Sequence, residues 1–179
     1  GTIVNDVSGS GFVTKTGTGV QTLSGANSYS GATTIEGGTL KLGHKNGIGN
    51  ISGHGRGFTL RNGAVDINGQ QSYTHAGGSP AWLINGEAIT LGGQASGTMV
   101  IANSVPGTSA GFTLFNLQNC ITYDAANDPG TATIAAPRYG TGASGLATKT
   151  ITVGDSAATS VELDFTGQMG QNACTDGQQ

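Results

Sequence analysis

The sequence predicts an all-β fold and favours a parallel β-solenoid of roughly seven coils, with an antiparallel β-sandwich or jelly roll as the alternative. Three observations lead to this expectation. Of the 179 residues, 33 are Gly, and Gly or Asn-Gly separates short runs in which apolar and polar residues alternate. No segment between these breakers has a 3.6-residue period, so no long helix is expected. The buried positions of the runs also recur at a nearly constant spacing, which indicates a repeat.

The alternating runs read as strands with one buried face. They cover residues 39–42, 64–67, 88–91 and 112–114. Their apolar pairs are Leu40 and Leu42, Val65 and Ile67, Ile89 and Leu91, and Phe112 and Leu114, at successive shifts of 25, 24 and 23 residues. In a solenoid these pairs would stack along one interior column. Four Asn-Gly pairs are hairpin signals and keep the sandwich open, although hairpins do not require a constant spacing.

Composition excludes several classes of protein. The net charge is −3 and the seven Lys and Arg residues are scattered, so nucleic acid is not an expected partner. No run of about 18 apolar residues is present, so no membrane-inserted helix is expected. Gly1 opens directly into polar sequence without a signal peptide, which indicates a mature form or an excised fragment.

The chain reads as a single all-β domain over 1–179. Its expected parts are a repeat at 11–43, further coils at 46–116, an irregular excursion at 117–148, terminal strands at 149–165 and a tail at 166–179. Cys120 and Cys174 are the only cysteines, and they are either a disulfide that staples the tail or two separate thiols. Neither has a neighbour at metal-ligand spacing, so no metal or other cofactor is predicted.

Residues 11–43 read GFVTKTGTGVQTLSGANSYSGATTIEGGTLKLG. This stretch closely resembles the autotransporter-associated β-strand repeat, also called the passenger-associated transport repeat, of surface and secreted proteins of Gram-negative bacteria. Every element of the family pattern is present, from Lys15-Thr16-Gly17 to Leu42-Gly43. The resemblance implies a right-handed parallel β-helix, export to the surface or medium, and a structural role. It implies no catalytic residues.

The sequence has ten Asp and Glu residues, and a glycosidase would need two of their carboxylates on either side of the scissile bond. The nearest pairs are Asp66 with Glu87 and Glu162 with Asp164, and solvated positions on a strand face are favoured for both. Asp124 and Asp128 match no calcium loop. The three His residues, His44, His54 and His75, have neither a nucleophile nor a metal-ligand motif nearby and are expected in turns or at the surface.

The predicted function is a non-enzymatic extracellular structural module, either a stalk, a spacer or a filament subunit that associates with itself through strand edges. A carbohydrate-binding or carbohydrate-active β-helix is the first alternative, with Trp82, Tyr73 and Tyr123 as candidate glycan contacts. An adhesin that contacts a host surface is the second.

For Tyr29, packing over a corner glycine is favoured over a role as a ligand platform.

Overall fold

The computed structural model of the chain describes ten segments. They are residues 1–3, 6–44, 47–48, 57–70, 84–102, 104–105, 115–135, 138–140, 150–166 and 168–170. The described residues form strands and turns, and they include no helix long and apolar enough to cross a lipid bilayer.

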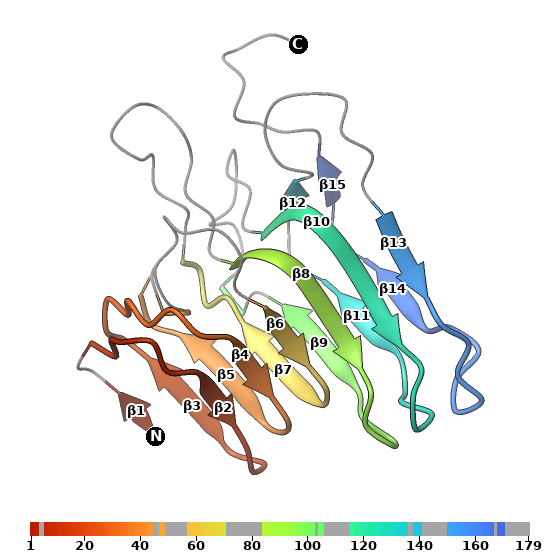
Figure 1. Cartoon of the computed structure of the whole chain (residues 1–179), viewed down its shortest axis with the longest axis horizontal. Coiled ribbons are helices and arrows are strands. Elements are labelled where there is room, and N and C mark those ends of the chain that lie inside the picture. The colour runs from red at the N-terminus through yellow and green to blue at the C-terminus, as the bar shows by residue number, and fades with distance from the viewer. Residues whose placement is uncertain are drawn as a thin grey trace, which may run out of the picture.

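The strands belong to two parallel sheets (Figure 1). Sheet A is ordered β1 (Thr2–Ile3), β3 (Val20–Leu23), β5 (Thr39–Leu42), β7 (Gly63–Asp66), β9 (Met99–Ala102), β11 (Ala132–Ile134) and β14 (Leu163–Phe165). Sheet B is ordered β2 (Val13–Lys15), β4 (Thr33–Ile35), β6 (Phe58–Leu60), β8 (Ile84–Gly92), β10 (Phe115–Asp124), β12 (Arg138–Gly140) and β15 (Gln168–Gly170), and β13 (Thr150–Val153) also pairs with β10.

The chain alternates between the sheets, so that one strand of sheet B and the next strand of sheet A make one coil. From β2 to β11, each strand pairs in parallel with the strand two places further along the chain. Parallel neighbours reached by a crossover on every turn define a parallel β-solenoid. The predicted fold class is therefore confirmed, and the antiparallel sandwich does not describe these strands.

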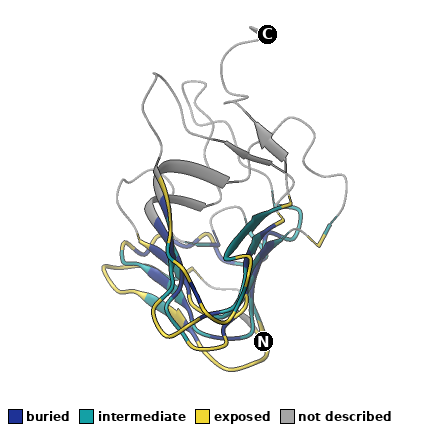
Figure 2. Cartoon of the chain, turned by 90° about the vertical axis from the view of Figure 1, so that its right-hand side faces the viewer, coloured by how far each residue is buried: buried dark blue, intermediate teal, exposed yellow. Residues whose placement is uncertain are grey.

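Between the two sheets lies a core of stacked aliphatic side chains. Figure 2 turns the ribbon by 90° and marks the strand residues that are buried. In sheet B one inward column runs Lys15, Ile35, Leu60, Leu91, Tyr123 and Val153. In sheet A the facing column runs Gln21, Leu40, Val65, Ile101, Ile134 and Phe165. The alternation of the sequence places every second residue in these columns, because successive side chains of a strand point to opposite faces.

The constant period predicted from sequence is wrong beyond its first step. Val65 does follow Leu40, but its next partner is Ile101 rather than Ile89. Ile89 belongs to the other sheet, where it pairs with Phe58. The number of residues between successive register partners also increases along the chain. In sheet B these partners are Lys15, Ile35, Leu60, Leu91 and Tyr123. Both sheets carry the same apolar–polar alternation, so the sequence pattern alone does not distinguish a strand of one sheet from a strand of the other. Phe112 and Leu114, the last pair of the predicted repeat, lie outside the described residues.

The stretch expected to be an irregular excursion, 117–148, contains β11, β12 and most of β10, and these strands pair in parallel with their neighbours. The coil therefore continues to at least residue 135. Part of the predicted tail, residues 168–170, pairs as β15 with β12. A register irregularity between Leu117 and Cys120 interrupts the pairing of β10 with β8.

One corner of the first coils requires glycine. Gly38 has a φ of 67°, and a Cβ atom there would meet the carbonyl oxygens of Gly17 and Gly19 in the coil below. Gly17 has a φ of 70°, but a Cβ atom there would meet no other atom. Gly19 has neither a left-handed φ nor a close neighbour at the Cβ position. Backbone approach between coils, and not only a sharp turn, therefore excludes a side chain at position 38.

We expect replacement of Gly19, Gly17 and Gly38 by Ala to destabilise the protein to an increasing extent, in that order. Gly19→Ala leaves the free energy of unfolding nearly unchanged, and Gly17→Ala lowers it by about 1 kcal/mol because of left-handed backbone strain. Gly38→Ala lowers it further, since backbone must also move. Urea unfolding of the three variants measures this order, and a Gly38→Ala variant no less stable than Gly17→Ala would contradict it.

Candidate functional site

The first complete coil carries a buried ammonium group at its corner. Lys15 occupies an inward position of β2 and is only 9% exposed, which is unusual for a charged side chain. Its Nζ donates hydrogen bonds to the carbonyl oxygens of Thr16 at 2.7 Å, Gly17 at 2.9 Å and Gly37 at 3.0 Å. The three donors of an ammonium are thus satisfied by corner carbonyls of two coils. The Lys-Thr-Gly opening of the repeat is a clamp that holds one corner onto the next.

The same coil end is polar where later coils are aliphatic. Lys15 begins the column continued by Ile35, and Gln21 begins the column continued by Leu40. The side-chain amide of Gln21 donates to the carbonyl of Thr22 at 3.0 Å. Lys15 lies on β2, the edge strand of sheet B, whereas β1 pairs with β3 and residue 1 lies against the Gln21 side chain. A polar residue suits the edge strand, because no strand of the described chain lies beyond it to bury its inner face. The role of Lys15 was not predicted from the sequence, although a polar residue at an inward position was the signal.

A second brace spans three successive coils. The side chain of Asn27 is 1% exposed. Its Oδ1 accepts a hydrogen bond from the Val7 amide at 2.8 Å, and its Nδ2 donates to the Gly47 carbonyl at 2.6 Å. Each partner is 20 residues away, which is one coil in this part of the chain. One amide side chain therefore replaces two backbone hydrogen bonds that the corner geometry leaves unmade.

Tyr29 is a buried residue near the corner; its predicted packing over a corner glycine stays a prediction. It is 2% exposed, and its hydroxyl shares a 2.7 Å hydrogen bond with Thr33 Oγ1. Thr33 is itself 2% exposed, so the pair satisfies two buried hydroxyls. This ring is not presented to solvent.

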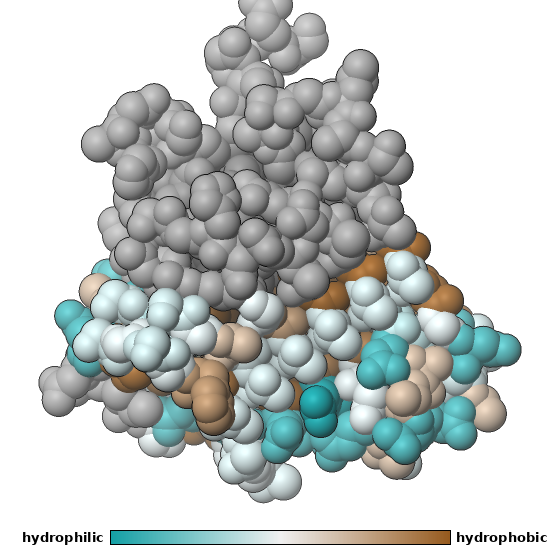
Figure 3. All heavy atoms as spheres, viewed as in Figure 1, coloured by the Kyte–Doolittle hydropathy of each residue, from teal (hydrophilic) through white to brown (hydrophobic). Residues whose placement is uncertain are grey.

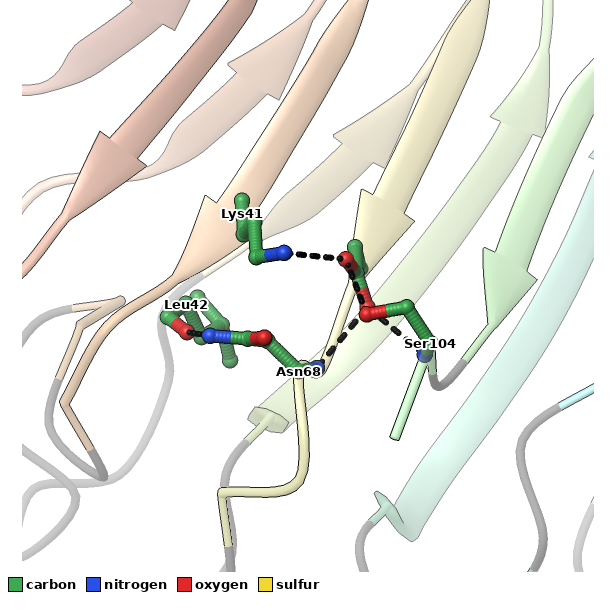
Figure 4. A network of polar contacts seen from close by, with 5 residues as sticks. Lys41, Leu42, Asn68 and Ser104 are labelled. Atoms are coloured by element: carbon green, nitrogen blue, oxygen red, sulfur yellow. Dashed lines mark hydrogen bonds and ion pairs between the residues drawn. The ribbon is translucent and has the colours of Figure 1, made fainter. Parts of the chain in front are cut away.

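Asp66 is the centre of a polar network on the outer face of sheet A. Figure 4 labels the residues that surround it, Lys41, Asn68 and Ser104, together with Leu42. Its carboxylate accepts hydrogen bonds from the Ser104 amide at 2.9 Å and hydroxyl at 2.7 Å, and from the Asn68 amide at 2.8 Å. Lys41 Nζ lies 3.5 Å away. Burial by itself would raise the pKa of Asp66, but these hydrogen bonds and the Lys41 charge outweigh it, and the pKa is lowered below 3.8.

This network ties three coils together. Lys41 belongs to β5 and Asp66 to β7, while Ser104 follows β9. The Asn68 side chain reaches in the opposite direction and donates to the Leu42 carbonyl at 2.8 Å. A carboxylate saturated with donors is poorly suited to act as a general base. The arrangement is structural.

The candidate carboxylate pairs are placed as follows. Asp66 lies in sheet A, whereas Glu87 lies in β8 of sheet B, so the two strands do not pair and the structure does not bring these residues together as neighbours in one sheet. Asp164 lies on β14 and Glu162 directly precedes that strand, two residues earlier, and both are half-buried. Among the described residues, no group of three or more His, Cys, Asp or Glu side chains is arranged to hold a metal ion.

Asp124, the last residue of β10, and Asp128 stabilise the turn that follows this strand. Asp124 Oδ1 accepts from the Ala126 amide at 3.0 Å, and Asp128 Oδ1 accepts from the Ala157 amide at 3.1 Å. Both therefore hold loops in place. His44 is half-buried and follows β5, while His54 and His75 lie outside the described residues.

Tyr123 does not offer its ring to a glycan, which corrects the expectation for this residue. It is 1% exposed in the inward column of β10. Its hydroxyl donates to the carbonyl oxygens of Pro129 at 2.9 Å and Gly130 at 3.0 Å, and burial raises the pKa of this hydroxyl above 10. The other two predicted glycan contacts, Trp82 and Tyr73, lie outside the described residues.

The two alternatives for Cys120 and Cys174, a disulfide or two separate thiols, also concern residues that fall largely outside the described part of the chain. Cys174 is among the undescribed positions, and Cys120 is placed only by its backbone, in register with Ala88 and Thr150. Its pairing with Cys174 stays a prediction.

Lys15→Met keeps the aliphatic stem and removes the ammonium. We expect the free energy of unfolding to fall by about 1–3 kcal/mol, because three corner carbonyls lose their donor. Lys41→Met is the control, since loss of a partly exposed ion pair costs about 0–1 kcal/mol. Chemical denaturation of both variants measures the difference, and equal losses would show that the clamp adds nothing to an ordinary surface lysine.

Asp66→Asn tests the network through its pH dependence. Since the folded-state pKa of Asp66 lies below 3.8, its charge stabilises the fold above that pH, and the contribution is lost as pH falls through the lowered value. The stability gap between wild type and Asp66→Asn, about 1–2 kcal/mol near neutral pH, should therefore close in acid. Asp155→Asn, at an exposed position, is the control and should show no such gap. A gap that persists unchanged in acid would contradict the assignment.

Comparison with known proteins gives a match in the first coils of the chain. No curated protein and no solved structure matches the chain. One family model does match, over residues 13–42, which run from β2 through β5. That family is the passenger-associated transport repeat of autotransporter passengers, which are secreted or surface-exposed. The Lys15 clamp and the Asn27 brace lie inside the matched segment, so the chain carries a passenger-associated transport repeat built into a β-solenoid.

Proposed function

We propose that this chain is a non-enzymatic structural module of an exported bacterial protein, a stiff stalk or filament subunit whose coil ends make the contacts. The solenoid supplies the stiffness, because every coil is hydrogen-bonded and packed to the next. The braces described above reinforce that stacking in its first coils. The donor-saturated carboxylate of Asp66 supports a structural role rather than a catalytic one.

The position of the exposed apolar residues carries the proposal. The large apolar side chains that are exposed in the described part of the chain are Phe12, Val20, Ile151, Val153 and Val161, at 42–77% exposure. All five lie in the first coil or the last one, and none lies in the coils between. Ile151 and Val153 occupy inward positions of β13, in register with the buried Ile121 and Tyr123. Residues at the inward positions of Ile151 and Val153 are buried in the coils that another coil follows, so a neighbouring solenoid end would cover these two side chains. Val20, in contrast, lies on the outer face of β3 in register with Thr39.

Substitution of Val by Lys at two places separates the ends from the sides. We expect the wild-type chain to form elongated assemblies as its concentration rises, and Val153→Lys to shift it to monomer by placing an ammonium in the stacking surface. Val100→Lys is the matched control, because Val100 is half-buried on the outer face of the middle strand β9. Light scattering after size-exclusion chromatography, with negative-stain microscopy, gives the readout.

Wild-type protein that stays monomeric over the whole concentration range would reject assembly through the ends. Equal loss of assembly in Val153→Lys and Val100→Lys would move the contact to a lateral face.

A further inference from the structure

The turn between β10 and β11 contains two consecutive left-handed residues in front of a proline. Asn127 has a φ of 64° and Asp128 has a φ of 50°. Residues other than glycine adopt this conformation singly, and the residue before a proline favours extended backbone. Both preferences are broken at Asp128, which precedes Pro129. The backbone is therefore strained on the amino side of the bond that joins these two residues.

Contacts from the two neighbouring coils hold the strained turn in place. In the coil before it, the Gly93 carbonyl accepts a hydrogen bond from Asn127 Nδ2 at 3.2 Å. In the coil after it, the Ala157 amide donates to Oδ1 of Asp128 at 3.1 Å. Backbone strain persists only where the surroundings fix the conformation in this way. Cleavage of the backbone within the turn would release it.

The two sides of the bond between Asp128 and Pro129 have different environments. Pro129 is buried, and its carbonyl oxygen accepts hydrogen bonds from the hydroxyls of Tyr123 at 2.9 Å and Ser156 at 2.7 Å. Asp128 is exposed. Hydrophilic residues line much of the lower edge of the described surface in Figure 3, where the long strands of sheet B end in the view of Figure 1. Water therefore reaches the bond from the Asp128 side, while the proline side is fixed.

An aspartate carries a nucleophile that can reach its own main-chain carbonyl carbon. Attack by a side-chain oxygen closes a five-membered anhydride ring, and the reaction is intramolecular. In Asp128 the Ala157 amide orients Oδ1, and no hydrogen bond within the described part of the chain engages Oδ2. The Ser96 amide donates a long hydrogen bond, at 3.5 Å, to the carbonyl oxygen of Asp128. A donor there stabilises the negative charge that this oxygen acquires during the attack.

We propose that the chain cuts its own backbone between Asp128 and Pro129. Oδ2 of Asp128 forms a bond to the carbonyl carbon of the same residue, the bond from that carbon to the Pro129 nitrogen breaks, and the nitrogen takes a proton from the solvent. One water molecule then opens the cyclic anhydride. The products are a new carboxyl terminus at Asp128 and a secondary amine at Pro129, so the net reaction is hydrolysis of one peptide bond.

Every Asp-Pro bond has this chemistry available to it, and the fold adds three features. These are the strained backbone, the oriented carboxylate and the Ser96 donor. The bond should therefore break faster in the folded protein than in the same sequence without the fold. The pieces stay associated afterwards, because β11 remains paired with β9 and β13 with β10.

The test follows the cut under denaturing conditions, since the fragments do not separate in the folded state. The full chain and a peptide of residues 121–135 are warmed in the same mildly acidic buffer, and their products are measured by mass spectrometry. We expect cleavage after Asp128 to be at least about tenfold faster in the folded chain than in the peptide. A folded chain that is cleaved no faster than the peptide would overturn the proposal.

Two matched variants identify the nucleophile. Asp128→Asn should lose the cleavage, whereas Asp124→Asn should be cleaved like wild type, because Asp124 lies in the same turn but does not precede a proline. Circular dichroism checks that both variants are folded. Equal cleavage of Asp128→Asn and wild type would overturn the assignment.

Labelling with heavy-oxygen water identifies the anhydride. Its opening places the label in either the main-chain or the side-chain carboxyl of Asp128, whereas a contaminating protease labels the main-chain carboxyl alone. Label found only in the main-chain carboxyl would overturn the proposed step. End-to-end assembly is measured separately, so this proposal and the proposed function can fail independently.

Discussion

The structure depends on one constraint: a coil of this protein cannot bury its own inner face. From β2 to β11 each coil contributes one short strand to each sheet, and its inward side chains pack between the two sheets but still need the coils before and after to cover them. The core is therefore a set of columns, such as Ile35, Leu60 and Leu91, and not a cluster around a centre. Stability in such a fold is the sum of nearest-neighbour interfaces, and the two ends are special by necessity.

The polar side chains at the corners follow from the same constraint. Backbone groups at a corner leave the sheet ladders, and they need partners because the interior excludes water. Lys15 supplies three donors to carbonyls, Asn27 bridges an amide and a carbonyl, and Asp66 collects donors from two turns. These three polar side chains thus serve to join coils, and they do not converge on a cleft in the part of the chain that the structure describes.

Sequence alone predicted the fold class, the inward residues of the first coils and the repeat, because alternation and corner glycines are local properties. It did not predict which sheet Ile89 joins or that Val65 meets Ile101, since the length of a coil depends on how many residues its corners take up. Lys15 and Tyr123 show the same limit for individual residues. An inward lysine and an inward tyrosine look like surface groups until the carbonyls that bind them are located in space.

The Asn27 brace has a mechanical consequence. Force applied along the stack pulls coils apart and loads the hydrogen bonds of one strand pair at a time, so an unbraced solenoid peels open at its weakest pair. A side chain that holds residues 7 and 47 at once shares that load between two successive coil interfaces. The first coils should therefore yield together under tension, as one mechanical unit, while coils without such a bridge separate singly.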